Sequence, residues 1–329
     1  MIASASYLKQ LDDALAFLRE GDNFLVVSHV QPDGDAISST VVVGWLLRKL
    51  GKSVTLINEG ELPSRLSFLH RSAEIVHYRA NPPQQVYDTV ISVDCADFRR
   101  IGDVANCFAE GVKLLNIDHH PTNNGFGLVN VIRDNAAATV EILYDLIERG
   151  GIQLDHDCAT AIYTGLLTDT GGFRYSNTSP RVMEIASKLL AIGVSGHQLA
   201  DHLLEKMTIA KLNLLKLALN RLTFTDDLKI GWVHIGKDDI RTTGALSEDL
   251  EGIVNYALNV DGVEVGILFK ETEDGAVKAS LRSAGKADVA AIAQSFGGGG
   301  HVRAAGCRLD CSIDAAPGLL VEAVRKALI

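Results

Sequence analysis

The sequence predicts an α/β protein with two domains joined by a helical linker. Its 329 residues exceed the usual size of a single domain. The first half alternates short apolar runs with helical patterns, which predicts a parallel-sheet domain with helices on both faces. The second half contains a hairpin signal, and there we expect a smaller α/β domain with a mixed sheet. The expected divisions are a first domain over residues 1–195, a linker over 196–222 and a second domain over 223–329.

Four short apolar runs are the expected strands of the first domain, at residues 24–27, 54–57, 90–93 and 114–117. An amphipathic helical pattern precedes them, and further helices are expected at residues 137–149, 157–168 and 180–192. Because helical segments separate the strands, the sheet should be mostly parallel.

A long helical pattern over residues 198–222 crosses the middle of the chain and contains the expected domain boundary. Beyond it, the apolar runs 263–271 and 276–283 flank an Asp-Gly turn signal, which predicts a β-hairpin. A helix over residues 288–296 runs into a four-glycine loop at 297–300, and a last helix closes the chain.

Composition excludes several classes of protein. Hydrophobic residues make up 47% of the chain and charged residues 22%, a balance that supports a large core. The net charge of −10 and the 6% of aromatic residues argue against a surface for long nucleic acid. The five scattered cysteines indicate a reducing compartment without a disulfide framework. We find no signal-peptide pattern and no run of ~18 apolar residues, so we expect a cytoplasmic protein without a membrane span.

Acidic and histidine side chains gather where the predicted strands end and where one helix ends. These residues are His29, Asp33, Asp35, Asp94, Asp118, His119, His120 and Asp169. In an open parallel sheet, ligands bind beyond the carboxyl ends of the strands, so these clusters can converge on one crevice. Carboxylates and imidazoles suit cations such as manganese.

Each cluster alone has an ordinary structural explanation. Asp33 lies in a Pro-Asp-Gly turn, and an aspartate such as Asp94 at a strand end is often a helix cap. Together the clusters favour a metal, because crowded carboxylates repel one another unless a cation neutralises them. Two cations need about six to eight donors. Six candidates are present: His29, Asp33, Asp35, Asp94, His119 and Asp169.

The motifs that carry these residues resemble a known family. The segments HVQPDGDA, VDCADFRRIG, NIDHHPTN, AAATVEI and TGLLTDTGGFRYSNT resemble the successive N-terminal motifs of the DHH phosphoesterases. The segment KASLRSAGKADVAAIAQSFGGGGHVRAAGCRL resembles the associated C-terminal domain of that family. The resemblance covers the whole chain and is greatest to the nanoRNase and pAp-phosphatase branch. Ala137 and Ala138 depart from it, since serines are expected at those positions.

The resemblance implies a role for each clustered residue. The expected cofactor is a pair of Mn²⁺ ions, for which Mg²⁺ or Co²⁺ could substitute. His120 would face the substrate phosphate as donor or proton carrier, and Asp118 would orient a histidine. One ion would be held by His29, Asp33, Asp94 and Asp169, and the other by Asp35, Asp94, His119 and Asp169.

The resemblance also implies residues that bind the substrate. Taken alone, Arg282 could be a surface charge and the glycine run a helix cap followed by a loop. The resemblance favours a clamp for the far phosphate or base of the substrate. The expected residues are Arg282, Gly298, Gly299, Gly300 and His301, with Arg100 as a further phosphate contact. Asn123 and Arg174 also match motif positions.

By resemblance, the chain should be a manganese-dependent phosphoesterase that hydrolyses short oligoribonucleotides and 3′-phosphoadenosine 5′-phosphate (pAp) to mononucleotides. One alternative is a phosphodiesterase for linear or cyclic dinucleotides such as pApA or c-di-AMP. Another is a pyrophosphatase or exopolyphosphatase, which should carry an Arg/Lys cluster in its second domain. A non-catalytic nucleotide-binding protein should have lost metal ligands, and all six are present. The expected partners are short RNA and small nucleotides, without long nucleic acid or membrane, and a homodimer is compatible with the sequence.

Overall fold

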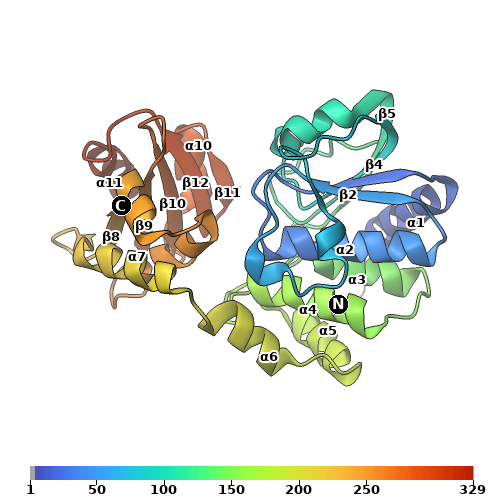
Figure 1. Cartoon of the computed structure of the whole chain (residues 1–329). Coiled ribbons are helices and arrows are strands. Elements are labelled where there is room, and N and C mark those ends of the chain that lie inside the picture. The colour runs from blue at the N-terminus through green and yellow to red at the C-terminus, as the bar shows by residue number, and fades with distance from the viewer. Residues whose placement is uncertain (1–3, 329) are drawn as a thin grey trace. The chain divides into compact units, whose positions relative to one another are not determined.

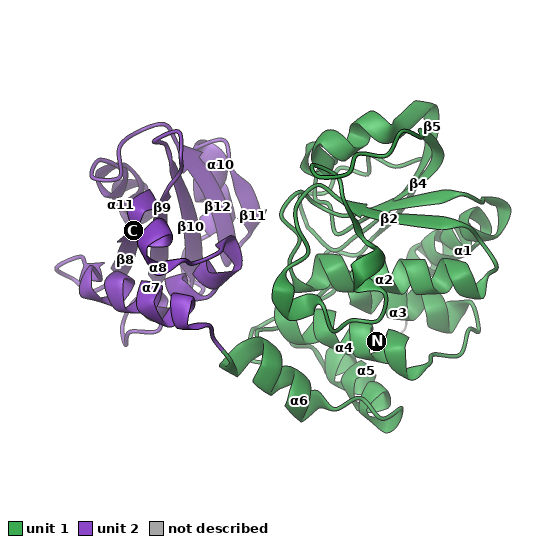
Figure 2. Cartoon of the chain, in the orientation of Figure 1, with its two compact units in different colours: residues 1–206 green, residues 207–329 purple. Residues whose placement is uncertain are grey.

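The computed structural model describes residues 4–328 and divides the chain into two compact units. The first comprises residues 1–206 and the second residues 207–329 (Figure 2). Each unit has its own sheet and its own hydrophobic core. The α/β fold with two sheets confirms the predicted fold class.

The first unit is built on a six-stranded sheet in which every pair of neighbouring strands is parallel. In spatial order its strands are β3 (Val76–His77), β2 (Val54–Asn58), β1 (Phe24–Val27), β4 (Tyr87–Val93), β5 (Phe108–Asp118) and β6 (Val129–Ile132). The chain leaves β1 toward β2 and later returns to β4 on the other side of β1. The strand order therefore reverses between β1 and β4, which is where such sheets bind ligands.

Helices cover both faces of this sheet, but unequally (Figure 1). One face buries most of the apolar core beneath the long helices, where Phe24 of β1 and Leu46 are fully buried. The other face packs against the 3₁₀ segment η3 through Ile101 and Val104. The helical elements up to residue 191 are α1 (Ala5–Glu20), α2 (Gly34–Lys49), η1 (Ser64–Leu66), η2 (Ser72–Glu74), η3 (Phe98–Cys107), α3 (Thr139–Arg149), α4 (His156–Asp169) and α5 (Pro180–Ala191).

The segment predicted as one long helix over residues 198–222 is interrupted. The first unit ends with α6 (Gly196–Ala200) and the π-helical turn η4 (Asp201–Glu205). The backbone of Lys206 is extended, and Thr208 then caps α7 (Ile209–Asn220) by accepting a hydrogen bond from the amide of Lys211. The apolar periodicity continues across this break, which is why the sequence suggested a single helix.

The second unit contains a mixed six-stranded sheet. In spatial order its strands are β11 (Gly299–His301), β12 (Ala304–Leu309), β10 (Val277–Ser283), β9 (Val265–Glu271), β8 (Ile230–Ile235) and β7 (Thr223–Phe224). Only β8 and β9 run parallel to each other within this sheet. The glycine run expected as a loop instead enters the sheet, because its last two residues, Gly299 and Gly300, form β11 together with His301.

Two helical layers enclose the second sheet. Phe269 of β9 is fully buried with α10 (Val289–Ser295) and α11 (Ala316–Ala327) on one face. Leu268, the next residue along β9, is buried with α7 and α9 (Ile253–Leu258) on the other face. The remaining helical elements are α8 (Lys237–Thr243) and η5 (Ser247–Leu250).

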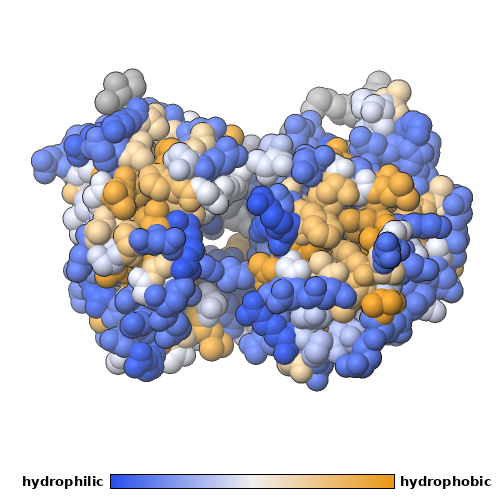
Figure 3. Space-filling view, turned by 90° about the horizontal axis from the view of Figure 1, so that it is seen from above, coloured by the Kyte–Doolittle hydropathy of each residue, from blue (hydrophilic) through white to orange (hydrophobic). Residues whose placement is uncertain are grey.

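The surface is that of an ordinary globular protein. In the face displayed in Figure 3, each unit mixes hydrophobic patches with hydrophilic side chains. Within residues 4–328, no helix combines the length and the apolar character needed to cross a membrane. All five cysteine thiols are free, and four of them are buried.

Candidate metal centre

The clustered acidic and histidine residues of the first unit converge at the carboxyl edge of its sheet. His29 lies just beyond β1, Asp94 directly follows β4, and His119 directly follows β5. Their side-chain donor atoms form overlapping groups in which all atoms lie within 4.8 Å of one another. These groups are His29, Asp33 and Asp94; Asp35, Asp94 and His119; and Asp94, Asp118 and His120.

Asp94 is common to all three groups. Its Oδ2 atom lies 3.5 Å from Nε2 of His29, and its Oδ1 atom lies 3.5 Å from Nε2 of His119. The residue is buried and adopts a left-handed backbone conformation with φ +56°, which is rare for a residue other than glycine. Its amide donates to the carbonyl of Ile117, which fixes this turn. The two carboxylate oxygens therefore face two different histidines.

The start of α2 supplies Asp33 on the His29 side. Asp33 is the N-cap of α2 and accepts a 3.1 Å hydrogen bond from the amide of Ala36. Its Oδ2 atom lies 3.8 Å from Nε2 of His29. A side chain in place of Gly34 would come within 2.4 Å of Thr168, so only glycine lets this turn approach the end of α4.

Asp35 points instead toward the start of α3. It accepts hydrogen bonds from the backbone amides of Thr139, at 2.6 Å, and Val140, at 3.2 Å. The N-cap of α3 is Ala138, whose side chain cannot cap the helix. The carboxylate of Asp35 takes over this role from another helix, which accounts for an alanine where a serine was expected.

Thr139 is a residue of this site that the sequence did not single out. Its hydroxyl donates a 2.9 Å hydrogen bond to Oδ1 of Asp94, while its amide binds Asp35. One residue thus holds two of the clustered carboxylates. The only signal in the sequence was its position at a helix start in the AAATVEI segment. Its contacts could not be predicted from that position, because Asp35 lies 104 residues away in the sequence and Asp94 lies 45 residues away.

Asp169 completes the cluster from the end of α4. It is the last residue of that helix, and its Oδ2 atom lies 3.4 Å from Nε2 of His119. The separations between donor atoms around Asp94, His29, His119 and Asp169 exceed the usual hydrogen-bond range. The histidine nitrogens and carboxylate oxygens are therefore held close together at separations longer than a well-formed hydrogen bond, an arrangement that suits a cation.

Each of the two consecutive histidines is oriented through Nδ1. His119 Nδ1 lies 3.2 Å from the carbonyl oxygen of Ala136, which can only accept, so Nδ1 carries the proton and Nε2 can bind a metal. His120 Nδ1 donates to Oδ1 of Asp118 at 2.8 Å. The other carboxylate oxygen, Asp118 Oδ2, accepts a 2.7 Å hydrogen bond from Asn123. Asp118 is fully buried, so the two hydrogen bonds that link Asn123, Asp118 and His120 fix the orientation of the His120 imidazole.

The electrostatics of the cluster favour a divalent cation. Burial and the charges of neighbouring aspartates raise the pKa of both Asp35 and Asp169 well above the usual range. Burial opposes protonation of His29, but interactions with Asp33 and Asp94 raise its pKa to about 9. The buried Nδ1 of His29 has no hydrogen-bond partner within residues 4–328. The residues therefore fit a metal, because a cation would neutralise these crowded carboxylates and compete with protons for them.

Arg100 lies beside this cluster on η3. Its carbonyl accepts a 2.8 Å hydrogen bond from the amide of Val30, which ties η3 to the loop after β1. Its positive charge opposes the protonation of both His29 and His120. Among the described residues, none forms a hydrogen bond or ion pair with its guanidinium. By contrast, the guanidinium of Arg174 donates to the carbonyl of Gly171.

In the second unit, two of the expected substrate-binding residues share one face of the sheet. Arg282 of β10 and His301 of β11 are both paired in register with Ala304 of the intervening strand β12. Residues directly opposite one another in a sheet project from the same face, so the small side chain of Ala304 separates the other two. Arg282 Nη1 also donates to the carbonyl of Leu281.

The glycine run has a structural basis in the same sheet. A side chain at Gly298 would lie 2.1 Å from the carbonyl oxygen of Gly306, and one at Gly300 would lie 2.5 Å from that of Ala304. Gly299 has open space on its side-chain side. Two of the three glycines therefore permit β11 to lie against β12, which the interpretation as a ligand loop did not anticipate.

Comparison with known proteins decides the family. The model of the DHH family, N-terminal domain, matches residues 23–166, and that of the DHHA1 domain matches residues 240–328. A Thermus thermophilus protein named bifunctional oligoribonuclease and PAP phosphatase NrnA is 35% identical over 308 residues, covering 92% of this chain and 89% of the relative. The chain belongs to the DHH family.

Two solved structures place this DHH-family chain among folds of the same kind. An exopolyphosphatase-related protein from Bacteroides fragilis superposes with a TM-score of 0.88 at 26% identity, covering 97% of this chain and 96% of that one. RecJ from Thermus thermophilus, solved in complex with Mn²⁺, gives a TM-score of 0.54 at 16% identity, covering 99% and 55%. The second likeness shows a shared fold alone.

Proposed function

We propose that this DHH-family protein is a metal-dependent phosphoesterase that hydrolyses short oligoribonucleotides and pAp to mononucleotides. The position of Asp94 between His29 and His119 carries the proposal, because it lets one buried carboxylate serve two cations. The substrate class is supported by the name of the Thermus thermophilus relative and by its similarity over 92% of this chain. A cytoplasmic location and short nucleotides as the only nucleic-acid partners belong to the same proposal.

The proposed cofactor is a pair of Mn²⁺ ions. The residues that would hold one ion are His29, Asp33, Asp94 and Asp169, and those for the other are Asp35, Asp94, His119 and Asp169. Bound ions of this kind polarise phosphate oxygens and lower the pKa of water. The chain contributes the arrangement of donors, since hydrogen bonds from Thr139 orient both Asp94 and Asp35.

His120 is proposed to hold or deliver a proton at the substrate phosphate. Burial opposes its protonation, but the hydrogen bond with Asp118 raises its pKa, which suits a proton donor. Asp118 keeps Nδ1 protonated and leaves Nε2 as the nitrogen for the substrate. Arg100 is proposed to bind a phosphate oxygen, because its guanidinium is otherwise unpaired within the described residues.

Recognition of the second phosphate or base of the substrate is proposed for the second unit. Arg282 and His301 project from one face of its sheet, and the half-buried Gly298, Gly299 and Gly300 directly precede His301. An arginine can hold a phosphate with two parallel hydrogen bonds. In this proposal the metal cluster binds the scissile phosphate, and Arg282 recognises the rest of the substrate.

The test is hydrolysis by the purified, manganese-loaded chain of a matched set of substrates. We expect pAp and dinucleotides to be cleaved much faster than long RNA, pyrophosphate and polyphosphate. The name of the Bacteroides fragilis neighbour makes polyphosphate the substrate to compare first. Faster release of phosphate from polyphosphate than from pAp would overturn the proposal. Cleavage of pApA in preference to ordinary dinucleotides would instead assign the protein to dinucleotide signalling.

A further inference from the structure

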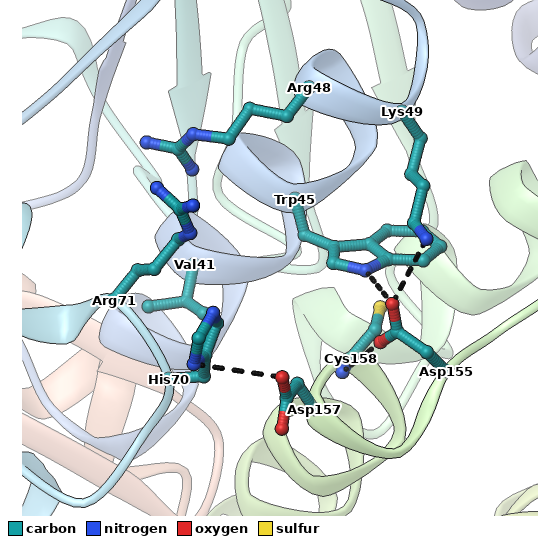
Figure 4. A pocket seen from close by; sticks show the side chains of 9 residues that line it. All are labelled: Val41, Trp45, Arg48, Lys49, His70, Arg71, Asp155, Asp157 and Cys158. Carbon is teal, nitrogen blue, oxygen red and sulfur yellow. Dashed lines mark hydrogen bonds and ion pairs between the residues drawn. The ribbon is translucent and has the colours of Figure 1, made fainter.

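A second cavity lies in the first unit, at the opposite end of α2 from the metal cluster. Thirteen helical positions separate Arg48 from Asp35, which at 1.5 Å per residue is roughly 20 Å. The cavity has a volume of about 210 Å³. Its lining residues are Val41, Trp45, Arg48, Lys49, His70, Arg71, Asp155, Asp157 and Cys158 (Figure 4).

Two arginines on one side of this cavity share a single carboxylate. Arg48 and Arg71 each form a 2.6 Å hydrogen bond with a different oxygen of Glu74, which leaves one positive charge in excess. Figure 4 shows their guanidinium groups next to each other. Burial and the charge of Arg71 lower the pKa of Arg48, as expected for neighbouring cations. The carboxylate of Glu74 offsets part of this repulsion, and a second anion beside the guanidiniums would offset the rest.

The backbone at Arg71 is held in an unusual conformation. Its φ is +64°, in the left-handed region that residues other than glycine rarely occupy. Residues held in such conformations are common at ligand sites, where the strain fixes a side chain in place. In Figure 4 the guanidinium of Arg71 lies beside that of Arg48, while 46% of the Arg71 side chain remains exposed to solvent.

The carboxylates on the opposite side of the cavity already have partners. Asp155 accepts hydrogen bonds from the indole of Trp45 at 2.7 Å and from the amide of Cys158 at 3.1 Å, and Lys49 lies 3.2 Å away. Asp157 lies 3.6 Å from His70. Lys49 offsets the charge of Asp155, and His70 offsets that of Asp157 only when it is protonated. The positive charge of the cavity is therefore concentrated at the two arginines, on the side away from these carboxylates (Figure 4).

We propose that this cavity is a second ligand site that binds a small phosphate monoester about the size of a sugar phosphate. Paired guanidiniums match the geometry of a phosphate group, and Val41 with the indole of Trp45 provides an apolar wall for the organic part. A volume of about 210 Å³ is below the roughly 300–1,000 Å³ of sites for drug-sized ligands, which excludes a whole dinucleotide.

The cavity is joined to the metal cluster by two packed helices. α2 carries Asp35 at its start and Arg48 near its end, while α4 begins at His156, lines the cavity with Asp157 and Cys158, and ends at Asp169. Both helices contribute buried side chains to one hydrophobic core. A ligand at this cavity therefore contacts the two elements that position metal-cluster carboxylates.

The fluorescence of Trp45 gives a local test on the manganese-loaded protein. The chain has two tryptophans, so a Trp232→Phe variant leaves Trp45 as the only emitter. In that background we expect ribose 5-phosphate to change the emission saturably, with inorganic phosphate weaker and ribose inactive. Arg71→Gln should raise the half-saturating concentration roughly tenfold or more, the effect of losing one charged hydrogen bond.

Two variants control this measurement. Arg149 is also a partly exposed arginine paired with one carboxylate, that of Asp12, and Arg149→Gln should bind normally. Asp94→Asn, compared with the wild type in the absence of manganese, should bind normally too, because the ligand does not contact the metal cluster. Calorimetry of the same variants detects binding that leaves Trp45 emission unchanged. The proposal is overturned if neither method detects saturable binding, if Arg71→Gln binds as well as Arg149→Gln, if Asp94→Asn abolishes the response, or if succinate binds as tightly as the phosphate ester.

Discussion

The backbone amide of Thr139 donates a 2.6 Å hydrogen bond to Asp35, so the first residue of α3 caps its helix with a carboxylate from α2. The hydroxyl of the same residue binds Asp94. The start of α3 thus orients both carboxylates proposed as ligands of one ion. The contribution of the Thr139 side chain can be separated from that of its backbone, because a substitution can remove the hydroxyl and keep the amide.

Thr139→Val should weaken Mn²⁺ binding by about ten- to a hundredfold, the usual effect of removing a hydrogen bond to a metal ligand. The valine keeps the amide contact with Asp35 and the shape of the side chain. Titration of Mn²⁺ followed by calorimetry measures the change. Thr160→Val is the matched control, since that hydroxyl only bonds within its own helix to the carbonyl of His156. Equal affinities in the two variants would show that the hydroxyl of Thr139 does not support the cluster.

The two consecutive histidines should respond differently to substitution. His120→Gln should retain bound manganese but slow turnover by ~10²-fold or more, since a proton donor is lost while the ligands remain. His119→Gln should lose manganese, because Nε2 of His119 faces both Asp94 and Asp169. Elemental analysis and initial rates for both variants distinguish the roles. Loss of manganese from His120→Gln with retention in His119→Gln would reverse the assignment.

Arg282→Ala should impair recognition of the substrate and leave the rate of phosphate ester cleavage itself unchanged. We expect kcat/KM for pAp and dinucleotides to fall about ten- to a hundredfold, as for one lost charged hydrogen bond of roughly 1.5–3 kcal/mol. Hydrolysis of a minimal phosphodiester without a second nucleotide should change little. Arg308 of β12 lies in the same sheet and pairs with Asp274, so Arg308→Ala is the control. An equal loss on both kinds of substrate would indicate an effect of Arg282 on folding or catalysis.

The glycines before His301 should differ sharply in their tolerance of alanine. Gly298→Ala forces a methyl group against the carbonyl of Gly306, and we expect it to destabilise the sheet by roughly 1–3 kcal/mol. Gly299→Ala meets open space and should change stability by less than about 0.5 kcal/mol. Hydrogen–deuterium exchange over β12 reports the difference directly. Similar protection in the two variants would mean that β11 does not pack as described.

The sequence predicted the parts of the site that depend on single strands. His29, Asp94 and His119 each follow an apolar run, and the topology of a parallel sheet is enough to bring such positions together. Thr139 could not be found in this way, because its role depends on how the start of α3 meets α2. Asp33 and Asp35 were predicted together as ligands, but the helix start turns them in different directions.

The second unit shows where local patterns mislead. Four consecutive glycines usually indicate a flexible segment, but the sheet requires Gly298 and Gly300 because β12 lies so close. Likewise, the helical pattern over residues 198–222 gave no sign of the break at Lys206, because apolar residues keep their spacing on both sides. In both cases packing between elements distant in sequence decided the local structure.

The manganese content of Asp94→Asn tests the account most directly. Asn removes the negative charge while keeping the size of the side chain. Asp94 is proposed, like Asp169, to bind both ions, and its two carboxylate oxygens face different histidines. Elemental analysis of the folded variant, beside the wild type loaded under the same conditions, measures bound manganese per chain. We expect two ions in the wild type and loss of manganese from the variant, together with loss of pAp hydrolysis. Two ions retained in an active Asp94→Asn protein would contradict the proposed role of Asp94 as a shared ligand.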